Sequence, residues 1–149
     1  MGLKVDTIQE PTSATVNLTL GTTGNVTTGA NLIVGANFTP VSYTETVVAI
    51  GTVTTTNTLS IAAGTVLTAT LTASTACTFT MPTVVAGKSF ILLLKQAATT
   101  GNGTATFTSV KWNGTGAPVI TATAGKMDIL TFVSDGTNWY GNYSQGYTP

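Results

Sequence analysis

The sequence contains no histidine, no arginine and a single cysteine. Without histidine it lacks the commonest general base and the commonest metal ligand, so a serine triad is excluded in its usual form. The lone Cys77 cannot form an intrachain disulfide. Because Cys77 alternates with Phe79 and Met81, we expect it to be a buried core thiol rather than a reactive one.

Charge is also scarce, since charged residues make up only 7% of the chain and the formal net charge is +0. Nucleic-acid binding needs a basic surface that displaces counterions from phosphate, and no basic surplus exists. The longest purely apolar run, residues 90–94, is far too short to cross a bilayer. The first residues lack a signal-peptide pattern. We therefore expect a soluble protein without nucleic-acid or membrane partners.

The acidic residues do not form an obvious catalytic pair. Asp6 and Glu10 lie near the start of the chain, and Asp135 belongs to a turn, which leaves Glu45 and Asp128. A glycoside hydrolase needs two carboxyl groups facing one sugar bond, and nothing in the sequence brings these two together. The interpretation is a protein that is not an enzyme and binds no cofactor or metal.

Most of the chain has the pattern of short β-strands. Threonine, the commonest residue, is β-branched and suits a pleated surface better than a helix. Turn signals separate candidate strands at residues 43–50, 52–61, 66–73, 76–81, 89–96, 104–112, 118–123 and 127–143. This spacing predicts an all-β fold, an antiparallel β-sandwich of jelly-roll type over residues 41–149, preceded by an extended N-terminal arm, residues 1–40.

Residues 127–143 form the predicted anchor of the core, a hairpin that turns at Asp135 and Gly136. Residues 90–94 are all apolar, with no polar side chain on either face of the strand. Both faces should therefore be covered, either within the sandwich or between subunits. The residues predicted to lie in the core or at a subunit interface are Phe90, Leu92, Leu94, Phe132 and Trp139.

The N-terminal arm, residues 1–40, has short apolar patches separated by glycine. Residues 14–20 alternate apolar and polar side chains, as a half-buried strand does. Two interpretations stay open: extra edge strands on the main domain, or an arm that orders when it docks on a partner. For the second, the predicted docking residues are Val5, Ile8, Val16, Leu18 and Leu20.

A series of motifs in the second half of the chain carries a family resemblance. The segments are 87–96 (Gly-Lys-Ser-Phe-Ile-Leu-Leu-Leu-Lys-Gln), 110–114, 117–120, 124–132 (Ala-Gly-Lys-Met-Asp-Ile-Leu-Thr-Phe) and 135–141 (Asp-Gly-Thr-Asn-Trp-Tyr-Gly). Together they resemble the β-rich domain that recurs in structural proteins of tailed bacteriophages, including tail-fibre and capsid-decoration proteins. The similarity covers residues 65–143, and residues 4–9 resemble the start of such proteins less specifically.

The resemblance implies a virion component without enzymatic activity, commonly a homotrimer. The chain lacks the repetitive shaft of a long fibre, so we expect a capsid decoration (cement) protein, made in the host cytoplasm. It would bind the major capsid protein on the outer surface of the head. The alternatives are a short tail-fibre or tail-tip adhesin and, from another class, a carbohydrate-binding module in which Trp112 or Trp139 stacks on sugar rings.

Overall fold

The computed structural model of the protein describes residues 37–114 and 116–149. The chain divides into two units, Met1–Val41 and Ser42–Pro149, and the strands below belong to the second. All five predicted docking residues of the arm lie outside the described residues: Val5, Ile8, Val16, Leu18 and Leu20.

The described residues contain strands and no helix, so the all-β prediction is confirmed. The strands are β1 (Val47–Val53), β2 (Thr56–Thr58), β3 (Val66–Leu71), β4 (Ala76–Thr80), β5 (Ser89–Lys95), β6 (Thr104–Phe107), β7 (Val110–Trp112), β8 (Met127–Ser134) and β9 (Trp139–Tyr147).

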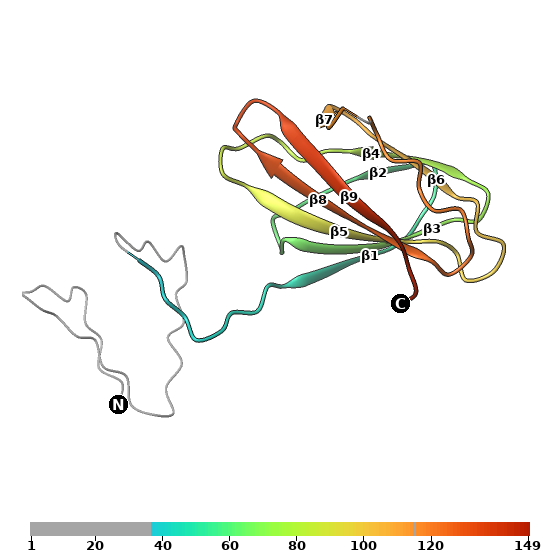
Figure 1. Cartoon of the computed structure of the whole chain (residues 1–149), viewed down its shortest axis with the longest axis horizontal. Coiled ribbons are helices and arrows are strands. Elements are labelled where there is room, and N and C mark those ends of the chain that lie inside the picture. Colours follow the sequence, from blue (N-terminus) through green and yellow to red (C-terminus); the bar gives the residue numbers. More distant parts are fainter. Residues whose placement is uncertain (1–36, 115) are drawn as a thin grey trace, which may run out of the picture. The chain divides into compact units, whose positions relative to one another are not determined.

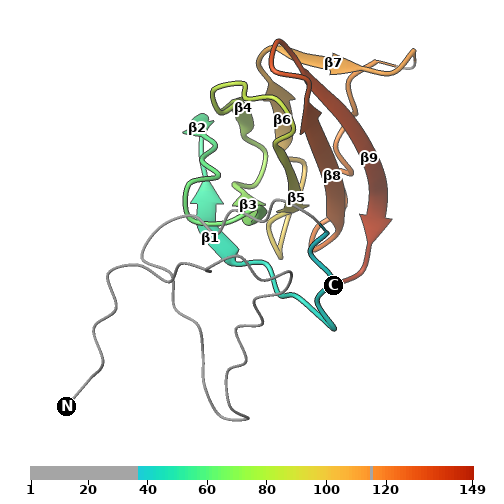
Figure 2. The same cartoon turned by 90° about the vertical axis from the view of Figure 1, so that its left-hand side faces the viewer.

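These strands form two sheets, one with six strands in the order β1-β3-β5-β8-β9-β7 and one with three in the order β2-β4-β6. The chain passes back and forth between the sheets (Figure 1, Figure 2), so that β1, β3 and β5 pair in parallel in one sheet and β2, β4 and β6 in the other. Each turn contributes one strand to each sheet. The result is a mostly parallel β-solenoid of about three turns.

The predicted antiparallel jelly-roll sandwich is therefore wrong. Parallel neighbours need a crossover connection, and here the strand of the second sheet supplies it, because β2 lies between β1 and β3 and β4 lies between β3 and β5. Antiparallel pairing is confined to β5 with β8 and β8 with β9. The last of these pairs is the hairpin that the sequence predicts.

A row of apolar side chains runs across the six-stranded sheet on the side that faces the three-stranded one. Register places Val48 beside Leu67, Leu67 beside Leu92, Leu92 beside Leu130 and Leu130 beside Tyr143. The three leucines of this row are fully buried. The three-stranded sheet covers them with a second set of core side chains: Cys77, Phe79, Met81 and Ala105.

All five predicted core or interface residues are buried within the unit: Phe90, Leu92, Leu94, Phe132 and Trp139. Phe90 stacks on Phe132 with ring centroids 4.7 Å apart and meets Trp139 edge-on at 5.2 Å. The Trp139 indole Nε1 donates a hydrogen bond of 2.8 Å to the Pro82 carbonyl. Cys77 is buried as predicted, and this burial raises the pKa of its thiol.

Two buried polar side chains hold the irregular segment before β8 against the solenoid. The Gln96 amide Nε2 donates to the carbonyls of Gly103 at 2.7 Å and Thr121 at 2.8 Å. The Asp128 carboxylate accepts hydrogen bonds from the Thr121 N–H at 2.8 Å and the Gly146 N–H at 2.9 Å. Residues 118–123, predicted as a strand, are not one. The carbonyl and N–H of Thr121 bond to the side chains of Gln96 and Asp128 instead of to a neighbouring strand.

Gly141 gives a test of the packing at the hairpin. A Cβ atom at this position would lie 2.5 Å from Cζ3 of the Trp112 ring, which packs directly over the glycine. We expect Gly141→Ala to lower the free energy of unfolding by about 1–3 kcal/mol, the usual cost of overpacking. Gly114→Ala is the matched control, because nothing lies within 4 Å of its added Cβ. Urea denaturation measures both, and equal midpoints would contradict the packing described.

Candidate interaction surface

The two sheets present very different outward faces. On the three-stranded sheet every outward side chain is exposed and is either threonine or alanine: Thr56, Thr58, Ala76, Thr78, Thr80, Thr104 and Thr106. Register aligns Thr56 with Thr78 and Thr78 with Thr106, and the last two hydroxyl groups lie 3.2 Å apart. This threonine face is polar and carries no charge.

The six-stranded sheet instead has an outward face with a large apolar content. Its apolar side chains are Val47, Val66, Ile91, Leu93, Met127, Ile129 and Val133, the alternates of the buried row. Val47 is 60% exposed and Val133 is 52% exposed. We call this surface the outer face. Exposed apolar patches of this kind mark contact surfaces more often than an even scatter of single side chains does.

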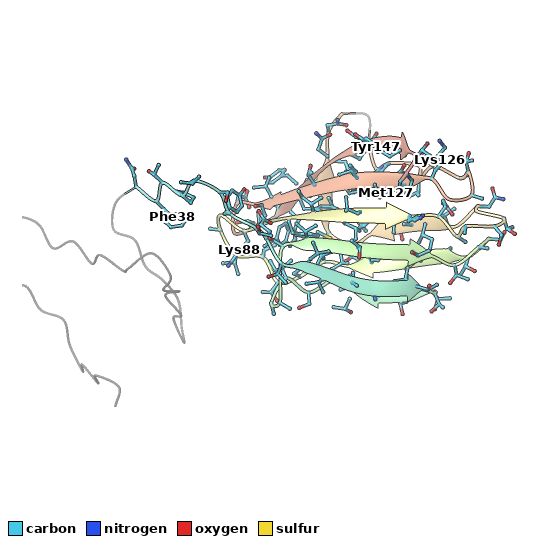
Figure 3. The ribbon with its side chains drawn as sticks, turned by 90° about the horizontal axis from the view of Figure 1, so that it is seen from below. Phe38, Lys88, Lys126, Met127 and Tyr147 are labelled. Carbon is cyan, nitrogen blue, oxygen red and sulfur yellow. The ribbon has the colours of Figure 1, made fainter. Side chains whose placement is uncertain are left out.

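Register makes the apolar part of the outer face continuous. One row joins Val47, Val66 and Ile91 across three strands, and in the next row Leu93 lies beside Ile129. At one end of the sheet Met127 and Tyr147 lie side by side, while Lys88 lies at the other end (Figure 3). The centre of the outer face is thus formed by neighbouring strands and not by separate side chains.

At the end nearer the start of β5, the outer face is hollowed into a shallow groove of about 450 Å³. Its lining includes Glu45, Ser89, Ile91, Val133 and Tyr140. The Glu45 carboxylate accepts a hydrogen bond from the Thr65 hydroxyl. A carboxylate, an aromatic ring and several hydroxyl groups therefore lie around an apolar floor.

The hairpin turn fixes Tyr140 at the rim of this groove. Asp135 Oδ1 accepts hydrogen bonds of 2.7 Å from the N–H groups of Thr137 and Asn138, and Oδ2 accepts one of 3.0 Å from the Tyr140 hydroxyl. The backbone N–H of Asn138, then that of Thr137, then the Tyr140 hydroxyl hold the pKa of Asp135 below its usual value. The same carboxylate raises the pKa of Tyr140.

The residues with possible chemistry are not brought together. Asp128 is buried between the sheets, whereas Glu45 is exposed and lines the groove on the outer face, so the two carboxylates left by the sequence analysis lie on opposite faces of one sheet. In the part of the chain that the structure describes, no three metal-ligating side chains are grouped. No helix among these residues is long and apolar enough to span a membrane.

The two tryptophans proposed as sugar-stacking residues are both engaged in packing. Trp139 is 1% exposed and cannot meet a ligand. Trp112 is half-buried, and its ring meets those of Phe107 at 5.8 Å, Phe132 at 5.9 Å and Tyr143 at 6.0 Å. Tyr140, 43% exposed, is an accessible aromatic at the groove that sequence reasoning did not single out. Because neighbouring residues of a strand point to opposite faces, a buried Trp139 would have predicted that Tyr140 points outward.

Comparison of the chain with protein-family models, with curated proteins and with solved structures finds no match.

The turn geometry predicts an acid-dependent contribution to stability. Because the folded pKa of Asp135 is below its unfolded value, the stabilisation is present above the unfolded pKa and is lost as pH falls through the folded pKa. We expect Asp135→Asn to be less stable than the parent at pH 7 and to equal it in strong acid. Tyr140→Phe should raise the pKa of Asp135, as followed by carboxyl NMR shifts. An Asp135 pKa at the ordinary value in both proteins would contradict the described bonds.

Proposed function

We propose that this protein is a capsid decoration (cement) protein of a tailed bacteriophage, which binds the assembled head shell and stabilises it without catalysing a reaction. Its partners are the major capsid protein and further copies of itself, three in the assembly that the family resemblance implies. The motifs within residues 65–143 support the class of protein. The large apolar area on the described surface supports a role in assembly.

One observation carries the docking part of the proposal. Residues 37–46, which lead into β1, have no regular strand or helix and expose three large apolar side chains. Phe38 is 65% exposed, Tyr43 is 73% exposed, and Val41 is fully exposed. These exposed apolar side chains are available to contact another protein. We infer that docking on the shell uses this segment together with the arm before it.

The mechanism in this proposal is thermodynamic linkage. A ligand that binds the assembled lattice better than its separated subunits adds its binding free energy to the stability of the lattice. Three docking segments on one trimer act together, so each contact can be weak. With few charges available, docking is mainly apolar and backbone-mediated, and raised salt should weaken it little.

A second candidate function is that of a tail-fibre or tail-tip adhesin. The groove on the outer face favours it, since a volume of about 450 Å³ lies within the usual range of ligand pockets and Tyr140 offers an aromatic surface beside polar groups. Host attachment that depends on Tyr140, with no effect on the stability of the head, would favour the adhesin over the cement protein.

The docking segment can be tested in the full-length chain. We expect the triple variant Phe38→Ser, Val41→Ser and Tyr43→Ser to fold normally and to bind particles that lack the protein at least about tenfold more weakly, because apolar contacts are lost. The control is Val85→Ser with Val119→Ser, which removes exposed valines elsewhere. Co-sedimentation with particles measures binding, and equal binding by both variants would refute the docking role.

The cement role itself is tested on whole particles. Stripping the protein should lower the temperature at which particles release their genome, and adding it back should restore that temperature, since bound protein stabilises the closed shell. Fluorescence of a DNA dye during heating reports the release. If stripped and decorated particles fail together while attachment to the host is lost, the adhesin takes the place of the cement protein.

A further inference from the structure

We propose that the outer face of the six-stranded sheet is the surface through which copies of this chain assemble, with the β1 side of one copy against the β9 and β7 side of the next. The occupant of this face is thus a second copy of the same chain. The inference rests on the self-association in the proposed function and does not depend on the capsid partner.

The two outward faces differ sharply in composition. Both sheets belong to one threonine-rich chain, and the three-stranded sheet uses only threonine and alanine on its outward side. On the six-stranded sheet, the outward side chains of the central strands β5 and β8 include Ile91, Leu93 and Ile129. A sheet with one face in water alternates apolar and polar side chains, whereas strands covered on both faces are apolar throughout. The centre of the outer face has the composition of a covered surface, and Thr68, Thr131 and Ser144 surround it.

The area of the outer face limits what can cover it. Five of the six strands, all but the three-residue β7, are six to nine residues long; at about 4.8 Å per strand and roughly 3.3 Å per residue they give a face of about 24 Å by 23 Å. This is on the order of 550 Å² before side-chain relief is counted. In a head-to-tail ring each copy divides the face between two neighbours, so each contact is smaller than the roughly 800 Å² per partner of a standard stable interface, and closure of the ring adds the two contacts together. The face is too large for a single sugar ring.

Opposite edges of the face carry charges of opposite sign. Glu45 lies on the β1 and β3 side, bonded to Thr65 directly before β3. At the same end of the sheet but on the opposite edge, Lys111 of β7 pairs in register with Tyr140. When the β1 side of one copy meets the β7 side of the next at the same height, Glu45 faces Lys111. Such a head-to-tail contact can close into a ring of three.

Lys95, at the far end of the outer face, does not oppose this arrangement. Lys95 projects from the far end of β5 beside Met127 and Thr70, where its side chain is half-buried. A lysine in such a position covers apolar surface with its methylene groups while its ammonium group reaches the rim. Complementary rim charges set the orientation of partners more than they set the affinity, so the apolar centre holds the copies together.

Sedimentation of the full-length protein tests the surface. We expect a trimer, and we expect Val133→Lys to raise the dissociation constant about 100-fold or more by placing an unpaired charge in the contact. Val133 is 52% exposed in the single chain, so this change should not disturb the fold. Leu93→Lys is the second variant, at the centre of the face. Thr106→Lys is the matched control, since it adds the same charge on the threonine face and should leave the trimer intact.

A charge exchange tests the orientation. Glu45→Lys should weaken assembly, and combining it with Lys111→Glu should restore it, because the pair is then reversed. A monomeric parent protein, both in solution and on particles, would overturn the inference. The inference would also be wrong if the Val133→Lys and Leu93→Lys variants stayed trimeric, even if they no longer bound the shell or a glycan. If the trimer depends on this face but does not stabilise particles, the proposed cement function is wrong and the inference about the face is still supported.

Discussion

The packing of in-register apolar rows between the two sheets is the constraint on which the rest of the structure depends. Val48, Leu67, Leu92 and Leu130 occupy neighbouring strands at one height, and the three leucines have no solvent exposure. Each turn of the solenoid is too short to bury its own apolar side chains, so every turn is stable only with the next one stacked on it. The β8–β9 hairpin, with Phe132 and Trp139 on its inner side, continues the six-stranded sheet beyond the third turn. Because the chain has no disulfide and, within residues 37–114 and 116–149, no grouped metal ligands, this packing accounts for the fold.

The same constraint separates the roles of the two outward surfaces. Once the inner sides of both sheets are used for the core, any further contact with another molecule must use an outward face or an edge. The threonine face is fully suited to water, with Thr56, Thr78 and Thr106 in one row. The outer face has Ile91, Leu93 and Ile129 at its centre and has charges only towards its margins. A small solenoid that stacks turns internally and presents one apolar face is suited to a structural assembly, which is compatible with the cement role proposed above.

Sequence reasoning recovers the strands, the hairpin and the core better than the way in which the strands pair. Alternation shows that Phe90, Leu92 and Leu94 lie on one side of a strand, but alternation is the same in parallel and antiparallel sheets. The turn signals between strands were interpreted as reversals, whereas here they are corners at which the chain crosses to the other sheet. A weak repeat was available, since a Thr-X-Thr pattern recurs at residues 56–58, 78–80 and 104–106, in each strand of the three-stranded sheet, although the same pattern also occurs elsewhere, for example at residues 52–54 and 68–70. Unequal spacing between turns conceals it, because a solenoid is normally recognised by a fixed period. The apolar run at residues 90–94 predicts cover on both faces; the structure buries Phe90, Leu92 and Leu94 within the unit, and cover over Ile91 and Leu93 stays a prediction because no sequence pattern states which molecule supplies it.

The most direct test of the central claim is a high-resolution electron cryomicroscopy structure of the protein on intact particles. The account predicts copies grouped in threes, with the outer face of each turned towards another copy, the threonine face towards solvent, and residues 37–46 against the shell. Copies that stand singly with the outer face open to solvent, or that turn the threonine face towards one another, would contradict it.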